Sequence, residues 1–420
     1  MAEHHVILGD GIAGATAAVT IRKQRPDDRI TLITNEAEPL YNRVKIKDFA
    51  KGQMEEKKVF MHDLEFYKKS DMELMLSTTV SHIDDTNNKV ALDDGRTVAY
   101  DKLLIAMGGV PKRLGMEGGD AKGIHTFWTF KEAREIREHA QRSKDGVAIG
   151  AGLLGIDIAV VFAKNGVDTK YVMRGNRWWR EGLSKEGSTI VENALSAMGV
   201  ECVFFETPKR FHTKDGHITA LETEAGKTIP CEIAGVAVGL NMNVQPVMGN
   251  NIKTGEGILT DSYLNTSVPN VWAAGDIAQY YDVIQDRINI NGSWASAKAQ
   301  GEVAGMNMIG VKTEFRHVDV YNINHFEFMV GSVGAIYGDT DAERIYGPTE
   351  YRRLVFKQGR LNGAVLMGNI AIQGQLRKVI ESKVECVQLK EEILAQKFVA
   401  EDIIAKCQGK TAAAATAAAQ

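Results

Sequence analysis

The chain has 420 residues, of which 44% are hydrophobic and 25% are charged, and its formal net charge at pH 7 is −4. This length excludes a single small core and predicts two or three domains. The slightly acidic charge gives no reason to expect nucleic acid as a partner. No apolar run is long enough to span a bilayer, and the N-terminus enters a strand without room for a signal peptide, which favours a cytoplasmic protein.

A βαβ unit is predicted at the start of the chain. The strand Val6–Leu8 leads into the glycine turn Gly9-Asp10-Gly11-Ile12-Ala13-Gly14, followed by a helix over 13–25 and a strand over 30–33. In such a turn the backbone and the positive end of the helix approach a pyrophosphate. Glu36 follows the second strand, where its carboxylate can bind both hydroxyls of a ribose.

A second unit of the same kind is predicted further along. The strand 147–149 leads into Gly150-Ala151-Gly152-Leu153-Leu154-Gly155, a helix over 153–165 and a strand over 167–173. This strand ends in Met173-Arg174 rather than in an acid. Arg174 and Arg177 slightly favour a 2′-phosphate, and so NADPH over NADH, although they can equally form a solvated face. Two dinucleotide sites in one chain predict electron transfer between the two.

The turn Ala274-Gly275-Asp276 follows a predicted strand. Asp276 can accept a hydrogen bond from a sugar-alcohol chain, or it can cap the next helix. The other expected elements are a meander over 80–98, buried strands over 100–108, 233–240 and 271–274, a helix over 291–308, C-terminal strands over 330–334, 351–356 and 361–367, and a helix over 373–385.

Over about residues 5–390 the chain resembles the FAD-dependent pyridine nucleotide oxidoreductases of the glutathione-reductase superfamily, in particular rubredoxin reductases and the flavin-containing part of NAD(P)H-nitrite reductase large subunits. Besides the three turns, the resemblance rests on Tyr41-Asn42-Arg43-Val44, Tyr100–Gly108, Val238-Gly239-Leu240, Trp294-Ala295-Ser296-Ala297 and Gln300-Gly301. It implies an α/β protein with two Rossmann-like dinucleotide-binding domains plus a C-terminal α+β domain. The implied boundaries are 1–112 and 242–313 for the discontinuous FAD-binding domain, 113–241 for the NAD(P)-binding domain, 314–405 for the C-terminal interface domain and 406–420 for a flexible tail.

The resemblance also implies the cofactors FAD and NAD(P)H and the residues that bind them, with no metal. The glycines of the first turn would hold the FAD pyrophosphate, and those of the second turn would cradle the nicotinamide dinucleotide. Glu36 would bind the adenosine ribose and Asp276 the ribityl chain. The full cofactor-binding set is Gly9, Gly11, Ile12, Ala13, Gly14, Glu36, Arg43, Lys47, Val80, Ala106, Gly108, Gly150, Gly152, Leu153, Leu154, Gly155, Asp157, Arg174, Arg177, Gly239, Gly275, Asp276, Ser293 and Trp294.

The chain departs from the disulfide-reducing members of this superfamily. It has neither their cysteine pair near residues 44–49 nor the single cysteine that oxidases and peroxidases carry there. Its four cysteines, Cys202, Cys231, Cys386 and Cys407, form no close pair. The flavin is therefore expected to deliver electrons directly. A Lys47–Asp157 pair beside the flavin is the predicted catalytic pair, and the alternative is that Lys47 contacts phosphate or solvent.

The expected function is transfer of hydride from NAD(P)H to FAD and then of electrons to a small carrier protein such as rubredoxin or ferredoxin. Alternatives are an NAD(P)H oxidase, a small-acceptor reductase, or an electron-transfer subunit of a larger complex, and a homodimer is also open. Trp178-Trp179 could cover the nicotinamide, form a partner surface or pack between domains. Basic residues that suit an acidic carrier, or else form an ordinary solvated face, are Arg344, Arg352, Arg353, Lys357, Arg360, Arg377 and Lys378.

Overall fold

The computed structural model describes residues 2–418, which divide into two compact units. The first unit comprises the chain up to Arg113, Thr126–Glu138 and Val238–His317. The second comprises Leu114–His125, His139–Ala237 and the chain from Val318 onwards. The short segment Thr126–Glu138 thus belongs with the first glycine turn, although the sequence places it in the NAD(P)-binding domain. The three-domain division stays a prediction.

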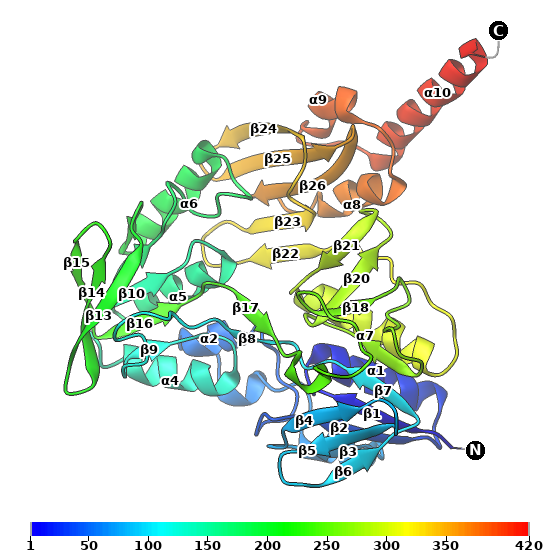
Figure 1. The fold of residues 1–420 in the computed structure, drawn as a ribbon. Helices are drawn as coiled ribbons and strands as arrows, with labels where there is room; N and C mark the ends of the chain where they lie inside the picture. Colours follow the sequence, from blue (N-terminus) through cyan, green and yellow to red (C-terminus); the bar gives the residue numbers. More distant parts are fainter. Residues whose placement is uncertain (1, 419–420) are drawn as a thin grey trace. The chain divides into compact units, whose positions relative to one another are not determined.

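A five-stranded parallel sheet forms the centre of the first unit. Four of its strands are almost entirely buried, which explains why they read as continuous apolar runs, whereas the edge strand Glu73–Met75 is exposed or half-buried. In sheet order they are β19 (Val271–Ala273), β7 (Lys102–Ile105), β1 (His4–Leu8), β2 (Arg29–Ile33) and β3 (Glu73–Met75). Figure 1 labels the last four of these strands.

Two helices of this unit, α1 (Ile12–Gln24) and α7 (Trp294–Met308), pack closely against each other. A Cβ on Gly301 would lie 2.2 Å from the carbonyl oxygen of Ala13, so only glycine allows this approach. Ser293 caps α7 by accepting a hydrogen bond from the backbone N–H of Ser296 at 3.1 Å. The helix predicted from the Asn-Gly-Ser sequence is therefore confirmed, with its first helical residue at Trp294.

Smaller elements complete the first unit. The predicted meander is an antiparallel sheet of three strands. Its strands, the remaining strands and the short helices are β4 (Val80–Asp84), β5 (Lys89–Leu92), β6 (Thr97–Ala99), β8 (Gly109–Pro111), β17 (Leu240–Met242), β18 (Ile258–Thr260), β20 (Ala278–Asp282), β21 (Arg287–Ile290), α2 (Ile46–Ala50), α3 (Leu64–Lys69) and the start of α4 (Phe130–Ala140).

The second unit contains another five-stranded parallel sheet. It carries α5 (Leu153–Lys164) and α6 (Lys185–Ala197), and a separate antiparallel sheet extends from it. The parallel strands are β12 (Val200–Val203), β11 (Asp168–Val172), β10 (Asp145–Ile149), β16 (Ile233–Val236) and β9 (Ile124–His125). The antiparallel strands are β13 (Pro208–Lys214), β14 (His217–Thr223) and β15 (Thr228–Pro230).

The C-terminal part of the second unit is an antiparallel sheet with helices, as the sequence predicts. Helix α8 (Gln373–Ser382) packs on the sheet and ends where Lys383 adopts a φ of +55°. In sheet order the strands are β22 (Val320–Ile323), β23 (Val330–Gly334), β26 (Arg360–Met367), β25 (Glu350–Lys357) and β24 (Thr340–Gly347), and α9 (Lys390–Ile393) and α10 (Ala400–Ala418) follow.

Two segments differ from the expected elements. The single strand expected over 233–240 is wrong, because β16 ends at Val236 and Gly239, with a φ of +109°, redirects the chain into β17. Helix α10 continues to Ala418 through the segment expected to be a flexible tail, since alanine is the strongest helix former. Residues 419 and 420 of that tail lie outside the described residues.

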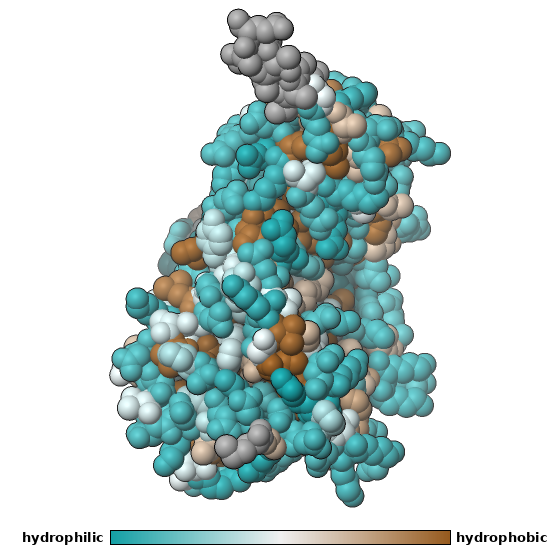
Figure 2. All heavy atoms as spheres, turned by 90° about the vertical axis from the view of Figure 1, so that its right-hand side faces the viewer, coloured by the Kyte–Doolittle hydropathy of each residue, from teal (hydrophilic) through white to brown (hydrophobic). Residues whose placement is uncertain are grey.

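The surface that Figure 2 shows is mainly hydrophilic, with apolar side chains in small groups between polar ones. Most large apolar side chains are buried in the cores of the two units. In the part of the chain that the structure describes, no helix is long and apolar enough to cross a membrane.

Candidate functional site

The first glycine turn has a distinct requirement at each glycine. Gly9 has a φ of +108°, and a Cβ there would lie 2.3 Å from the carbonyl oxygen of Ala106. A Cβ on Gly14 would lie 2.0 Å from the carbonyl oxygen of Gly9. A Cβ on Gly11, the N-cap of α1, would meet no other described atom within 4 Å. The turn is therefore tightly packed at Gly9 and Gly14 and open at Gly11, where a pyrophosphate fits.

A pocket opens beside this turn in the first unit. It brings together several residues that the sequence assigns to FAD binding, including Glu36 after β2 and Arg43 before α2. Its lining residues are Asp10, Gly11, Ile12, Thr34, Glu36, Glu38, Pro39, Leu40, Tyr41, Arg43 and Trp294. The chemistry of this lining suits an adenosine diphosphate moiety, because it combines a phosphate-binding turn, a carboxylate and an arginine.

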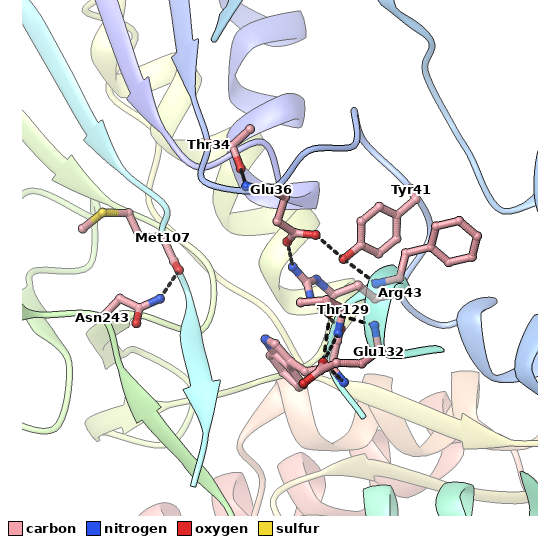
Figure 3. Close-up of polar contacts among 10 residues, drawn as sticks. Thr34, Glu36, Tyr41, Arg43, Met107, Thr129, Glu132 and Asn243 are labelled. Carbon is pink, nitrogen blue, oxygen red and sulfur yellow. Dashed lines mark hydrogen bonds and ion pairs between the residues drawn. The ribbon is translucent and has the colours of Figure 1, made fainter. Parts of the chain in front are cut away.

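The Glu36 carboxylate is held from two sides (Figure 3). Tyr41 donates its hydroxyl hydrogen to one oxygen at 2.5 Å, and Arg43 donates to the other at 2.5 Å. Arg43 also donates to the carbonyl oxygen of Trp128 at 2.5 Å. Burial would lower the pKa of Arg43, but Tyr41, Glu36 and Asp276 together raise it above its ordinary value. Arg43 therefore stays a cation at the pocket.

Asp276 lies in the turn after β19, close enough to Arg43 for the two charges to interact. Burial raises its pKa to about 6, although Arg43 opposes that shift. The preceding Gly275 has a φ of +80° and donates its N–H to the side chain of Gln300 at 2.8 Å. The turn is thus fixed to α7, and the carboxylate is presented as a hydrogen-bond acceptor.

Asp10 is a pocket residue that the sequence reading did not assign. Its side chain accepts from the Tyr67 hydroxyl at 2.8 Å, and burial raises its pKa to about 7. The sequence offered one signal for Asp10, because an acidic residue is unfavourable inside a turn that binds phosphate.

The second glycine turn repeats the arrangement in the second unit. Gly150 has a φ of +122°, and a Cβ there would lie 2.1 Å from the carbonyl oxygen of Ala237. A Cβ on Gly155 would lie 1.9 Å from the carbonyl oxygen of Gly150. Gly152, the N-cap of α5, again faces space in which no described atom lies within 4 Å of an added Cβ. Leu153 and Leu154 are the first residues of α5.

The Trp178-Trp179 segment folds back onto this second turn. The Trp178 side chain is fully buried, and its indole N–H and the Tyr171 hydroxyl both donate to the carbonyl oxygen of Gly152 at 3.3 Å. The backbone N–H of Trp179 donates to the carbonyl oxygen of Ala151 at 3.0 Å. Trp178 therefore supports the turn from within its own unit, which excludes it as an exposed partner surface.

Asp157 lies on α5, one helical turn after Leu153, and its side chain contacts His325. The His325 Nε2 and the Asp157 Oδ1 form a hydrogen bond, and both side chains are buried. His325 comes from the connection between β22 and β23, so no local pattern could have joined the two residues. Lys47 is buried on α2 of the first unit, and its pairing with Asp157 stays a prediction.

The two predicted arginines differ in their surroundings. Arg177 donates to the carbonyl oxygens of Leu183 and Arg180 at 2.9 and 3.1 Å, so its guanidinium stabilises its own loop. Arg174 is exposed. If a 2′-phosphate is bound here, Arg174 is the better placed of the two, because its donors are at the surface.

The other predicted cofactor residues lie at the ends of strands or helices. Val80 begins β4, and Gly239 lies between β16 and β17. Ala13 is buried in the first turn of α1, Ala106 and Gly108 follow β7, and Ser293 and Trp294 begin α7. All of these residues belong to the first unit.

The basic C-terminal face is corrected by the structure. Arg352 is only 2% exposed and donates to the carbonyl oxygens of Ile393 and Ala395, so it cannot contact a carrier. Four of the others are paired with acidic side chains: Arg344 with Glu391, Arg353 with Asp341, Arg377 with Glu381 and Lys378 with Glu401. The net positive charge of this surface is correspondingly small.

The cysteines are not activated. Cys231, Cys386 and Cys407 are buried, and Cys202 is half-buried. Burial raises the pKa of Cys202 and Cys231 to about 12 and that of Cys386 to about 11. Thiols in these surroundings stay protonated, which disfavours a redox relay through them.

Three acidic or imidazole groups, Glu3, His5 and Asp28, lie near one another in the first unit. The Asp28 oxygens accept from the backbone N–H of Glu3 at 3.1 Å and contact His5 Nε2 at 2.9 Å. These contacts connect the N-terminal residues to the turn before β2, so a structural role explains the cluster.

Residues 3–301 match the model of the pyridine nucleotide-disulphide oxidoreductase family, and the chain belongs to that family. The cofactors of this family are FAD and NAD(P)H, as the two turns predict. Residues 321–384 match the model of the rubredoxin NAD+ reductase C-terminal domain. The predicted α/β class with two dinucleotide-binding sheets is thereby confirmed.

Individual relatives are distant. The NADH-rubredoxin oxidoreductase of Clostridium acetobutylicum is 24% identical over 90% of this chain and 94% of its own length. The nitrite reductase [NAD(P)H] of Bacillus subtilis is 23% identical over 90% of this chain, which spans 47%, about half, of that protein. A ferredoxin reductase from Rhodopseudomonas palustris shares the fold with a TM-score of 0.88 at 22% identity, covering 95% of this chain and 99% of its own.

Proposed function

We propose that this protein takes hydride from NAD(P)H onto FAD and passes the electrons to a small one-electron carrier protein of the rubredoxin or ferredoxin type. The observation that carries the proposal is the pair of glycine turns, each closed at its first and third glycine and open at its second. Each turn ends a strand of a separate parallel sheet. The rubredoxin reductase relative and the matching C-terminal domain support the choice of carrier.

FAD, when bound, accepts two electrons as hydride and can release them singly. The residues of the chain provide binding and orientation. The open N-terminus of α1 binds the pyrophosphate, Arg43 supplies a cation, Glu36 contacts the ribose and Asp276 accepts from the ribityl chain. The Gly152 end of α5 binds the pyrophosphate of the nicotinamide dinucleotide. Hydride transfer requires mainly this orientation, so a strong acid or base is unnecessary.

A second candidate is the electron-entry part of a larger assembly. It is favoured by the extent of the match to nitrite reductase, which covers about half of that protein. The two candidates predict different behaviour of the isolated chain. The first predicts turnover with a free carrier protein, and the second predicts no such turnover. A cytoplasmic location is proposed for both, and a homodimer is compatible with either.

The deciding experiment is an anaerobic titration of the FAD-loaded protein with NADH and, separately, NADPH, following the oxidised flavin absorbance. Bleaching at one equivalent is expected with one of them. The reduced protein is then mixed with oxidised rubredoxin, ferredoxin or air-saturated buffer. Fast reoxidation by a carrier supports the proposal, whereas reoxidation by oxygen alone supports an oxidase. A flavin that neither nucleotide bleaches contradicts the proposed function.

A further inference from the structure

Residues 178–184, which we call the support segment, lie between β11 and α6 and contact the second glycine turn. The Trp179 N–H donates to the carbonyl oxygen of Ala151 at 3.0 Å, and the Trp178 indole donates to that of Gly152 at 3.3 Å. In a trans peptide the C=O and the following N–H point in opposite directions. The hydrogen bond to Ala151 therefore directs the N–H of Gly152 away from the support segment, so this segment fixes the orientation of the turn.

The backbone of the support segment has an unfavourable conformation at Trp179. Its φ is +45°, in the left-handed region that a bulky residue rarely adopts. The N–H groups of Gly182 and Leu183 donate to the Trp179 carbonyl oxygen at 2.9 and 3.0 Å. Such a conformation persists only where the surrounding contacts maintain it. Loss of one of these contacts should therefore displace Trp179 and weaken its hydrogen bond to Ala151.

The C-terminal sheet supplies a contact at the other end of the support segment. Arg353 on β25 donates from Nη1 to the carbonyl oxygen of Glu181 at 2.9 Å. Its Nε donates to the carboxylate of Asp341 on β24 at 2.8 Å, which orients the guanidinium. The Arg353 side chain is 17% exposed. One arginine thus joins two strands of the C-terminal sheet to the segment that contacts the glycine turn.

Tyr351, two residues before Arg353 on β25, makes a second contact of the same kind. Its hydroxyl lies 3.4 Å from the Ser184 Oγ and donates to the Glu343 carboxylate at 2.5 Å. A Cβ on Gly187 would lie 2.8 Å from the Tyr351 ring, so the first turn of α6 packs directly on it. Side chains two residues apart on a strand share a face of the sheet. Arg353 and Tyr351 therefore act on the support segment from the same face.

We propose that Arg353, assisted by Tyr351, is a positioning residue for the nicotinamide dinucleotide, because it holds the support segment and thereby keeps the second glycine turn in its binding form. This inference rests on the proposed function, in which that turn binds the pyrophosphate of NAD(P)H. It requires no contact between either side chain and the nucleotide. The region that matches the rubredoxin NAD+ reductase C-terminal domain then contributes to nucleotide binding as well.

The test compares the parent with Arg353→Gln, both full-length and FAD-loaded. The first readout is the Kd of NAD+, or of NADP+ if the flavin titration selects NADPH. The second is amide hydrogen exchange of the support segment. We expect Arg353→Gln to raise the Kd about three- to ten-fold, which corresponds to the loss of one hydrogen bond at the turn. Exchange within the segment should become faster, while FAD content stays at the parent value.

Two further variants separate this effect from a general loss of stability. Arg353→Lys keeps a cation and a donor, so it should restore part of the affinity and part of the protection from exchange. Arg210→Gln is the matched control, because it breaks another arginine–carboxylate pair between neighbouring strands of the second unit, Arg210 on β13 with Glu222 on β14. It should change neither readout. If Arg353→Gln fails to fold, Tyr351→Phe replaces it, with the same expected directions.

Three results would overturn the inference: an unchanged Kd in Arg353→Gln, a higher Kd without faster exchange in the support segment, or an equal rise of the Kd in Arg210→Gln. A merely structural role of Arg353 gives the first or the third of these results. If the parent still binds the nucleotide and its flavin is bleached by NADH or NADPH, the proposed function survives such a result. A parent that binds neither nucleotide would contradict the proposed function itself and this inference with it.

Discussion

Asp10 illustrates how a single side chain is affected by its position in a phosphate-binding turn. Its carboxylate is 7% exposed and faces a pocket where an anion is expected. Burial raises its pKa from 3.8 to about 7, and the hydrogen bond from Tyr67 opposes the rise. Because the pKa is higher in the folded state, the stability from this group is complete below pH 3.8 and is lost as pH rises through 7.

We therefore expect Asp10→Asn to remove a pH-dependent loss of stability. Between pH 5 and pH 8 the parent should lose on the order of 2–3 kcal/mol from this group, and the variant should not. The measurement is urea unfolding of both proteins at the two pH values, with equal FAD content. Tyr67→Phe removes the opposing hydrogen bond, so it should enlarge the loss. An equal loss in parent and Asp10→Asn contradicts the assignment.

At the scale of elements, the second glycine turn depends on a segment that follows it in sequence by more than twenty residues. The Trp178 indole donates to the Gly152 carbonyl oxygen, and its ring is fully buried. Trp178→Phe keeps most of the ring volume but removes the donor. Since one hydrogen bond contributes about 0.5–1.5 kcal/mol, we expect nucleotide affinity to fall about two- to ten-fold while FAD content is unchanged.

The control for this prediction is Trp272→Phe on β19. Among the described residues the buried Trp272 Nε1 has no hydrogen-bond partner, so the same substitution removes no bond there. Nucleotide affinity, measured by titration with NAD+, should stay at the parent value. Equal weakening in both variants would mean that loss of aromatic volume, and not the Gly152 contact, is responsible.

The contact between α1 and α7 offers a second prediction at this scale. Gly301→Ala should lower the Tm by several degrees and reduce FAD content, because its Cβ would lie 2.2 Å from the Ala13 carbonyl oxygen. Gly374→Ala on α8 is the control, since its Cβ would meet no described atom within 4 Å. That variant should be stabilised by about 0.5–1 kcal/mol. Thermal unfolding and flavin absorbance measure both effects, and an unchanged Gly301→Ala protein would contradict the close packing.

At the scale of the whole molecule, we expect substitutions in the two glycine turns to have separate effects, one on FAD binding and the other on reduction by NAD(P)H. Gly14→Ala places a Cβ 2.0 Å from the Gly9 carbonyl oxygen and should abolish FAD binding. Gly155→Ala places one 1.9 Å from the Gly150 carbonyl oxygen and should leave FAD bound and reducible by dithionite. Its reduction by NAD(P)H should slow by at least about ten-fold, since a displaced turn misplaces the nucleotide. Loss of FAD in Gly155→Ala would contradict the separate assignment of the two turns.

Local sequence was sufficient for both βαβ units and for the turn at Asp276. In these turns glycine is required by backbone sterics, and the flanking strands and helices follow from apolar runs and capping residues. Each of these signals therefore lies within about thirty residues of sequence. Of the pocket residues, Gly11, Ile12 and Glu36 were predicted from such motifs, whereas Arg43 and Trp294 were predicted only from the family resemblance. For Asp10, which was missed, the only local signal was its place inside the phosphate-binding turn. Its raised pKa comes from burial in the folded chain, and the Tyr67 hydroxyl that donates to it and opposes that rise comes from 57 residues away in sequence.

The sequence by itself therefore determined the α/β class, the two dinucleotide turns and the absence of a cysteine pair near residues 44–49, because backbone conformation and composition are local properties. Only the tertiary structure decided that His325 meets Asp157, that Trp178 supports Gly152, and that Arg352 is buried rather than exposed. Each of these depends on contacts between segments distant in the chain. Burial and pairing arise from packing, and the charge and pKa of a group follow from them.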